Sequence, residues 1–169
     1  TGAVALGTDS MAGGNGARAE TDGAVALGAG AIATGGKATS IGFGNRASGN
    51  GAVAIGDPNV ATGTGALAMG ADNTATGDGA IALGNLSTAT GLSTIALGSN
   101  AKGLADGGVA LGNFASAGAL GSIAIGEAAE GRFEDSISIG RNRFAIGLHS
   151  MALGADPEAF DERSVAVAG

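Results

Sequence analysis

Ile81-Ala82-Leu83-Gly84 is one copy of a phrase that recurs along the chain at constant spacing. Each copy has an apolar residue, a small residue, a second apolar residue and then glycine, which alanine replaces in the last copy. Eight consecutive steps of 14 residues separate the first residues of nine copies, which are Val53, Leu67, Ile81, Ile95, Val109, Ile123, Ile137, Met151 and Val165. So regular a repeat predicts a protein in which each unit packs on the next one.

Glycine marks a half-period of seven residues. Of the 24 positions divisible by seven from Gly7 to Ala168, 18 hold glycine. A glycine inside a structured element costs roughly 0.5–1 kcal/mol relative to alanine. Its regular placement therefore indicates corners, where the backbone needs a positive φ or a close approach to another segment.

The first part of the chain departs from this spacing. Before Val53 the phrase begins at Val4, Val25 and Ile41, and the steps between these starts are irregular. The first step, from Val4 to Val25, is half as long again as the regular one and predicts an insertion between Thr8 and Asp22. We expect a single domain over residues 1–169, with irregular coils in residues 1–52 and regular 14-residue repeats in residues 53–169.

Each heptad has the pattern of one short strand and one turn. Between the glycines, apolar and small residues alternate with a period of two, which is typical of a β-strand and not of a helix. Asp, Asn, Ser and Pro follow the glycines and favour turns. The sequence therefore predicts an all-β parallel β-roll, or β-solenoid, of 14-residue coils with two short strands per coil. Twelve coils stacked at roughly 4.8 Å would make a rod of roughly 55 Å.

The two faces of each predicted strand differ in side-chain size. Alanine, serine and asparagine recur four and two residues before the heptad glycines in both halves of the repeat, and we expect them inside a thin roll. The opposite face then points outward. It holds threonine in one half of the repeat and aliphatic residues in the other, among them Ile81, Leu83, Ile95, Leu97, Val109, Leu111, Ile123 and Ile125.

The aliphatic stripe predicts an oligomer. An exposed stripe over twelve coils is larger than soluble monomers tolerate, and covering each side chain contributes about 1.5–3 kcal/mol. We therefore expect the eight aliphatic residues to pack against sister chains around a symmetry axis parallel to the rod. The alternative packing places Val, Ile and Leu inside the roll and alanine on the axis. That arrangement also keeps an oligomer but weakens its driving force.

Composition excludes several classes of protein. The 169 residues include 35 glycines but no cysteine, so disulfides, Cys-zinc sites and thiol catalysis are excluded. A net charge of −7 argues against nucleic acid as a partner, because counterion release needs clustered cations. No apolar run is long enough for a membrane-spanning helix.

The sequence offers little for catalysis. His149 is the only histidine, and its register places it in a turn without a second base or a nucleophile. Glu130, Glu134 and Asp135 fall near it, a set that suggests a metal site, but solvated turn charges are the simpler interpretation. We expect a protein that is not an enzyme and has no catalytic, cofactor-binding or metal-binding residues.

One cluster departs from the Thr-Ala-Thr pattern of the regular coils. Arginine and aromatic residues, which carry much of the binding energy at interfaces, replace threonine in two neighbouring coils. This candidate ligand patch consists of Arg132, Phe133, Arg141, Arg143 and Phe144, with Ile146 and Leu148 beside them. The alternative is that these residues cap bulges or pack on a neighbouring chain.

The repeat resembles that of a known family. Residues 73–84, which read Asn-Thr-Ala-Thr-Gly-Asp-Gly-Ala-Ile-Ala-Leu-Gly, look like the 14-residue head repeat of YadA-like trimeric autotransporter adhesins of Gram-negative bacteria. The resemblance covers nearly the whole chain. It implies a left-handed β-roll, a homotrimer, and attachment to host-cell surfaces or extracellular-matrix proteins. It also implies display on the cell surface through a stalk and an outer-membrane anchor that are not in this sequence.

The chain departs from the family pattern in several coils. The second glycine is shifted or lost around Gly103, Gly118, Gly131 and Asp161, and we expect bulges there. A non-adhesive structural β-solenoid remains the alternative function. In particular, stacked Thr-x-Thr pairs in two coils would suit an ice-binding surface; they are Thr74 and Thr76, and Thr88 and Thr90.

Overall fold

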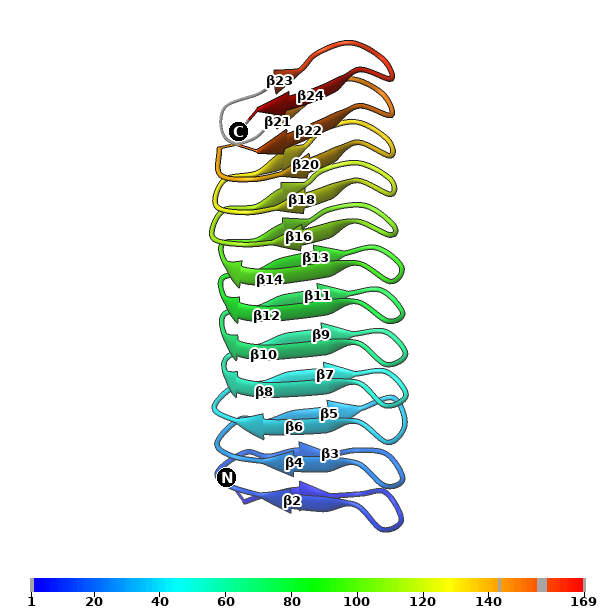
Figure 1. Ribbon diagram of the computed structural model, residues 1–169. Helices are drawn as coiled ribbons and strands as arrows, with labels where there is room; N and C mark the ends of the chain where they lie inside the picture. Colours follow the sequence, from blue (N-terminus) through cyan, green and yellow to red (C-terminus); the bar gives the residue numbers. More distant parts are fainter. Residues whose placement is uncertain (1, 143, 155–157, 169) are drawn as a thin grey trace.

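The chain forms a stack of flattened coils built from two parallel sheets (Figure 1). The computed structural model describes residues 2–142, 144–154 and 158–168. Within these residues each sheet has 12 strands, and each coil contributes one strand to each sheet. No helix among these residues is long and apolar enough to cross a membrane.

The odd-numbered strands form one sheet, which we call sheet A, and the even-numbered strands form the other, sheet B. Sheet A contains β1 (Val4–Ala5), β3 (Arg18–Ala19), β5 (Ile32–Thr34), β7 (Arg46–Ser48), β9 (Val60–Thr62), β11 (Thr74–Thr76), β13 (Thr88–Thr90), β15 (Lys102–Gly103), β17 (Ser116–Ala117), β19 (Glu130–Gly131), β21 (Phe144–Ala145) and β23 (Glu158–Ala159). Sheet B contains β2 (Met11–Gly13), β4 (Val25–Leu27), β6 (Thr39–Gly42), β8 (Val53–Asp57), β10 (Leu67–Ala71), β12 (Ile81–Asn85), β14 (Ile95–Ser99), β16 (Val109–Leu111), β18 (Ile123–Ile125), β20 (Ile137–Ile139), β22 (Met151–Gly154) and β24 (Val165–Ala168).

Neighbouring strands pair in one constant register throughout the stack. Ile81 pairs with Ile95 in sheet B, and Thr74 pairs with Thr88 in sheet A. The same offset joins Val4 to Arg18 in the first coils and Met151 to Val165 in the last ones. The predicted all-β solenoid of 14-residue coils with two strands per coil is confirmed.

The insertion expected between Thr8 and Asp22 does not occur in this described segment. Val4 lies in sheet A and Val25 in sheet B, so the long step between them is one coil plus one heptad. Likewise, the residue that pairs with Val25 is Thr39 and not Ile41. The prediction was wrong because the same phrase occurs in both sheets, and its spacing alone does not say to which sheet a copy belongs.

Small side chains fill the interior of the roll. Ala75 in sheet A and Ala82 in sheet B are fully buried, as are the equivalent alanines of most coils. The aliphatic residues that alternate with them, such as Ile81 and Leu83, remain partly exposed on the outside. The predicted orientation of the two faces is therefore present in the chain, and the reverse packing is excluded.

Close contact between coils requires glycine at the ends of the central sheet B strands. Gly70 has a φ of 120°, and a Cβ at this position would lie 2.0 Å from the carbonyl oxygen of Gly84 in the next coil. Such a distance is far below any van der Waals contact. A side chain here would have to separate the coils or break the strand.

The bulges expected around Gly103, Gly118, Gly131 and Asp161 do not form in the described residues. Lys102, Ser116, Glu130, Phe144 and Glu158 pair in sequence, each one coil after the last. The coil length is therefore kept although the second heptad glycine is shifted or lost.

A serine side chain supports the turns of several of these coils. In a regular coil Gly77 has a φ of 127° and donates its N–H to the carbonyl of Thr62 in the preceding coil at 2.8 Å. In a later coil Ala119 stands at the equivalent place, and its N–H donates to the Oγ of Ser122 at 3.1 Å, while this Oγ donates to the carbonyl of Ala119 at 2.7 Å. Ser136 and Ser164 make the same contact with Phe133 and Asp161 at 2.6 and 2.7 Å. A second turn chemistry therefore closes these coils without an extra residue.

Candidate functional site

The outer face of sheet B carries the predicted aliphatic stripe. Ile81, Ile95, Val109 and Ile123 form one column across β12, β14, β16 and β18, and Leu83, Leu97, Leu111 and Ile125 form a second column beside it. All eight side chains are partly exposed in the single chain. The stripe continues beyond them, because Met69 is 41% exposed in β10 and Val167 is 70% exposed in β24. The roll itself buries alanine and leaves its larger apolar side chains uncovered.

The outer face of sheet A is different in character. The Thr-x-Thr pairs stack as predicted, with Thr74 on Thr88 and Thr76 on Thr90. Val60 and Lys102 adjoin the column of Thr74 and Thr88 at its two ends. The array with both columns is therefore two coils long, although the column of Thr76 and Thr90 continues through Thr62, Ser48 and Thr34.

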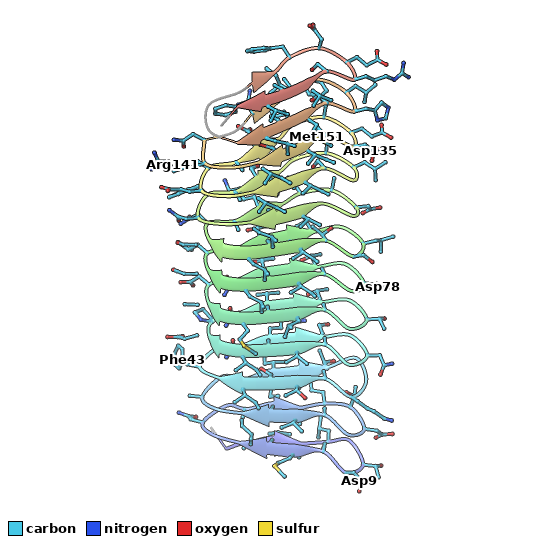
Figure 2. The ribbon with its side chains drawn as sticks, viewed as in Figure 1. Asp9, Phe43, Asp78, Asp135, Arg141 and Met151 are labelled. Carbon is cyan, nitrogen blue, oxygen red and sulfur yellow. The ribbon has the colours of Figure 1, made fainter. Side chains whose placement is uncertain are left out.

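The structure divides the candidate ligand patch. Arg132 and Phe144 lie together on the outer face of sheet A, with the guanidinium carbon 5.6 Å from the centroid of the ring. Phe133 lies in the turn between β19 and β20, whereas Arg141 lies in the turn between β20 and β21. Figure 2 shows these two kinds of turn at opposite edges of the roll, where Asp135 and Arg141 are labelled. Arg143 lies outside the described residues.

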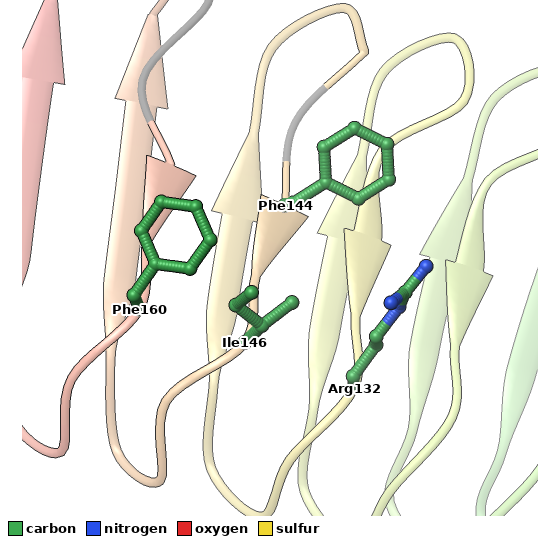
Figure 3. Close-up of a pocket in the computed structure, with 4 residues that line it drawn as sticks. All are labelled: Arg132, Phe144, Ile146 and Phe160. Carbon is green, nitrogen blue, oxygen red and sulfur yellow. The ribbon is translucent and has the colours of Figure 1, made fainter.

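Arg132 and Phe144 line a shallow hollow together with Ile146 and Phe160 (Figure 3). The hollow has a volume of about 220 Å³. Arg132, Ile146 and Phe160 follow one another at intervals of one coil, so the stacking of coils brings them into one column. The sequence analysis did not include Phe160 in the patch. Its spacing of two coils from Arg132 places it in the same column and could have identified it.

Arg132 is oriented by Glu130 in the same coil. Its Nε lies 2.7 Å from one carboxylate oxygen, and its Nη2 donates to the other at 2.9 Å. This hydrogen bonding, together with the charge of Glu130, raises the pKa of Arg132 above its usual value. Both side chains remain accessible to water, so the pair contributes little to stability. Its main effect is to hold the planar guanidinium beside Phe144.

His149 lies in a turn, as the register predicts, and its Nδ1 is 3.5 Å from a carboxylate oxygen of Asp135. Glu134 contributes its backbone carbonyl, which accepts the N–H of His149 at 3.0 Å. The carboxylate of Glu130 binds Arg132 instead of turning toward His149. In the part of the chain that is described, no three or more side chains of the metal-binding kind come together.

The repeat and its geometry match a known family of domains. The family model of the YadA head domain repeat matches most of the chain, at residues 5–31, 33–57, 61–87, 75–101, 89–115, 104–129 and 145–167. This chain belongs to the YadA head family. YadA heads are parts of adhesins and not enzymes, in agreement with the prediction of a non-catalytic chain.

A solved structure is also similar to this YadA-type head. It is the crystal structure of the collagen-binding domain of the Yersinia adhesin YadA, which is 36% identical in sequence. The similarity covers 82% of this chain and 70% of that one, with a TM-score of 0.46. No curated protein sequence gives a significant match.

Proposed function

We propose that residues 1–169 form a single head domain that assembles as a homotrimer and attaches a bacterial cell to collagen or a related matrix protein. The observation that carries this proposal is the uncovered aliphatic stripe on sheet B of a chain that belongs to the YadA head family. The proposal includes display at the cell surface, with the anchor in another segment of the protein.

The stripe supports assembly through sheet B. Its two columns are straight because the register is constant from β12 to β18, so a second copy placed side by side can bury the same residues along its whole length. The residues that the proposal places at the interface are the eight of the predicted stripe, from Ile81 to Ile125. The number of three chains follows the family and not the geometry of one chain.

Assembly through sheet B leaves sheet A on the outside of the oligomer. Three outward faces of the same kind allow several weak contacts to a long, repetitive ligand at once, and linked contacts raise the overall affinity well above that of one face. A fibrous matrix protein presents such repeated sites. The sequence identity of 36% to the collagen-binding Yersinia domain supports this choice of ligand.

Binding to immobilised triple-helical collagen tests the proposal. The purified assembly should bind collagen saturably, and it should bind serum albumin on the same surface much more weakly. Heat-denatured collagen serves as a second control, because it has the same composition without the triple helix. Equal binding to collagen and albumin, or no binding to collagen, would contradict the proposed ligand.

A further inference from the structure

The hollow on sheet A is set apart from the rest of that face by its side chains. At the same positions, earlier coils carry Thr62, Thr76 and Thr90, whereas the last coils carry Arg132, Ile146 and Phe160. Figure 3 shows Phe144 and Phe160 on either side of Ile146, with Arg132 next to Phe144. Phe160 is 59% exposed, although its ring is among the largest apolar groups of the chain.

We propose that this hollow binds a bulky apolar side chain from an extended peptide segment of a partner protein, with a backbone carbonyl of that segment accepting a hydrogen bond from Arg132. The site consists of Arg132, Phe144, Ile146 and Phe160. The proposal deepens the adhesive function and rests on it for the nature of the partner as a protein.

The apolar side chains of the hollow select the kind of group that enters it. Two phenyl rings and one isoleucine line it, and among the side chains of the described residues that line it only that of Arg132 is polar. Small pockets lined in this way bind apolar groups and use the few polar atoms to fix their orientation. A sugar ring would bring several hydroxyls, and most of them would find no partner among these four residues.

The charge of the site selects a neutral acceptor. Glu130 accepts a hydrogen bond from Nη2 of Arg132 and forms an ion pair with its Nε, so the pair is neutral overall. An anionic group at the guanidinium would approach the carboxylate of Glu130 and be repelled. Arginine has further N–H groups in the same plane, and these suit a carbonyl oxygen. In a peptide a backbone carbonyl always accompanies the side chain. A peptide can therefore fill the apolar hollow and accept a hydrogen bond from Arg132 at the same time.

A titration of the full chain with N-acetyl-L-phenylalaninamide tests the site directly. The protein carries ¹³C-labelled isoleucine methyl groups, and Ile146→Val identifies the signal of Ile146. We expect a saturable shift of the Ile146 methyl signal, while the signal of Ile95 on sheet B does not move. N-acetylglycinamide, which has the same backbone without the ring, should bind much more weakly.

Variants of two lining residues on the outer face of sheet A sharpen the test without disturbing the core. Phe144→Ala and Phe160→Ala should each weaken binding of the amide about tenfold, since a truncated aromatic anchor commonly has this effect. Phe114→Ala is the matched control, because Phe114 is 59% exposed in a turn outside the hollow, and it should leave binding unchanged.

Several outcomes would overturn the proposal. These are no saturable shift at Ile146, unchanged binding by Phe144→Ala, or equal binding of the glycine amide. Preference for N-acetyl-L-phenylalanine, with its free carboxylate, would indicate an anion site, and preference for methyl α-glucoside would indicate a sugar site. None of these results bears on collagen binding by the oligomer, so failure of the site and failure of the adhesive function are distinguishable.

Discussion

Asn73 donates a hydrogen bond from Nδ2 to Oδ1 of Asn59 at 2.9 Å, inside a roll otherwise filled mainly by alanine. Asn59 donates in the same way to Asn45 at 3.1 Å, so three consecutive coils are joined by a ladder of buried amides. The ladder ends where the N–H of Ser87 donates to Oδ1 of Asn73 at 2.9 Å. Because the amides bind one another and the backbone, their burial leaves no polar atom unpaired.

Asn59→Ala should lower the free energy of unfolding by about 2–3 kcal/mol, because it leaves buried groups unpaired. Among them is the carbonyl of Gly70, which accepts from Asn59 Nδ2 at 2.8 Å. Thermal and urea unfolding followed by circular dichroism would measure the change. Thr76→Ala, at an exposed position of sheet A, is the control and should change stability by less than about 0.5 kcal/mol. A loss for Asn59→Ala no larger than that of the control would show that the ladder is not a stabilising element.

Ser138→Ala should stabilise the fold, by about 0.5–1 kcal/mol. Ser138 is fully buried, and its Oγ lacks a hydrogen-bond partner in the described structure. Ser40 is the matched control at the same position of an earlier coil, where its Oγ donates to the carbonyl of Asn45 at 2.9 Å. Ser40→Ala should be destabilising. The explanation fails if unfolding experiments give the two substitutions effects of the same sign.

Leu97→Asp should dissociate the proposed trimer, because it places a charge at the centre of the aliphatic stripe. Thr76→Asp should leave the assembly intact, because Thr76 lies on the outer face of sheet A. Sedimentation equilibrium at micromolar concentration distinguishes the species. An unchanged trimer for Leu97→Asp, or its loss for Thr76→Asp, would mean that the chains associate through another face.

Gly70→Ala should destabilise the fold by more than about 3 kcal/mol, because the added Cβ would meet the Gly84 carbonyl oxygen at 2.0 Å. Gly65→Ala is the comparison for a turn glycine whose positive φ is combined with open space. Gly65 has a φ of 67°, and a Cβ there would have no atom within 4 Å, so we expect a cost of about 1 kcal/mol. The difference between the two midpoints of unfolding measures the close approach of the coils together with the more strained φ of Gly70. Similar midpoints would show that the backbone around Gly70 does not require glycine.

The fold and its faces could be predicted from the sequence to a large extent. Once Ile81 and Ile95 were known to begin equivalent phrases, parallel stacking required them to be neighbours, and the alternation of Ile81 with Ala82 separated the outside from the inside. These features are local and repeat in every coil, so the same alternation of apolar and small residues is observed many times within one chain. The eight residues of the stripe were identified for that reason.

The local sequence pattern did not determine the sheet to which a strand belongs, the hydrogen bonds of each turn or the residues of the hollow, and only the tertiary structure did. Val4 and Val25 begin the same phrase but lie in different sheets, because either face of a thin roll accepts the same alternation. Ser122 and Gly77 close their turns by different hydrogen bonds, so a lost glycine did not mean a bulge. The hollow likewise depends on side chains from successive coils: stacking brings Arg132 close to Phe160 on sheet A, whereas Arg141 lies in a turn at one edge of the roll. The sequence by itself determined the period, the strands and their faces, because hydrogen bonding between identical coils fixes them. Which side chains from different coils meet was decided only when the stack was assembled.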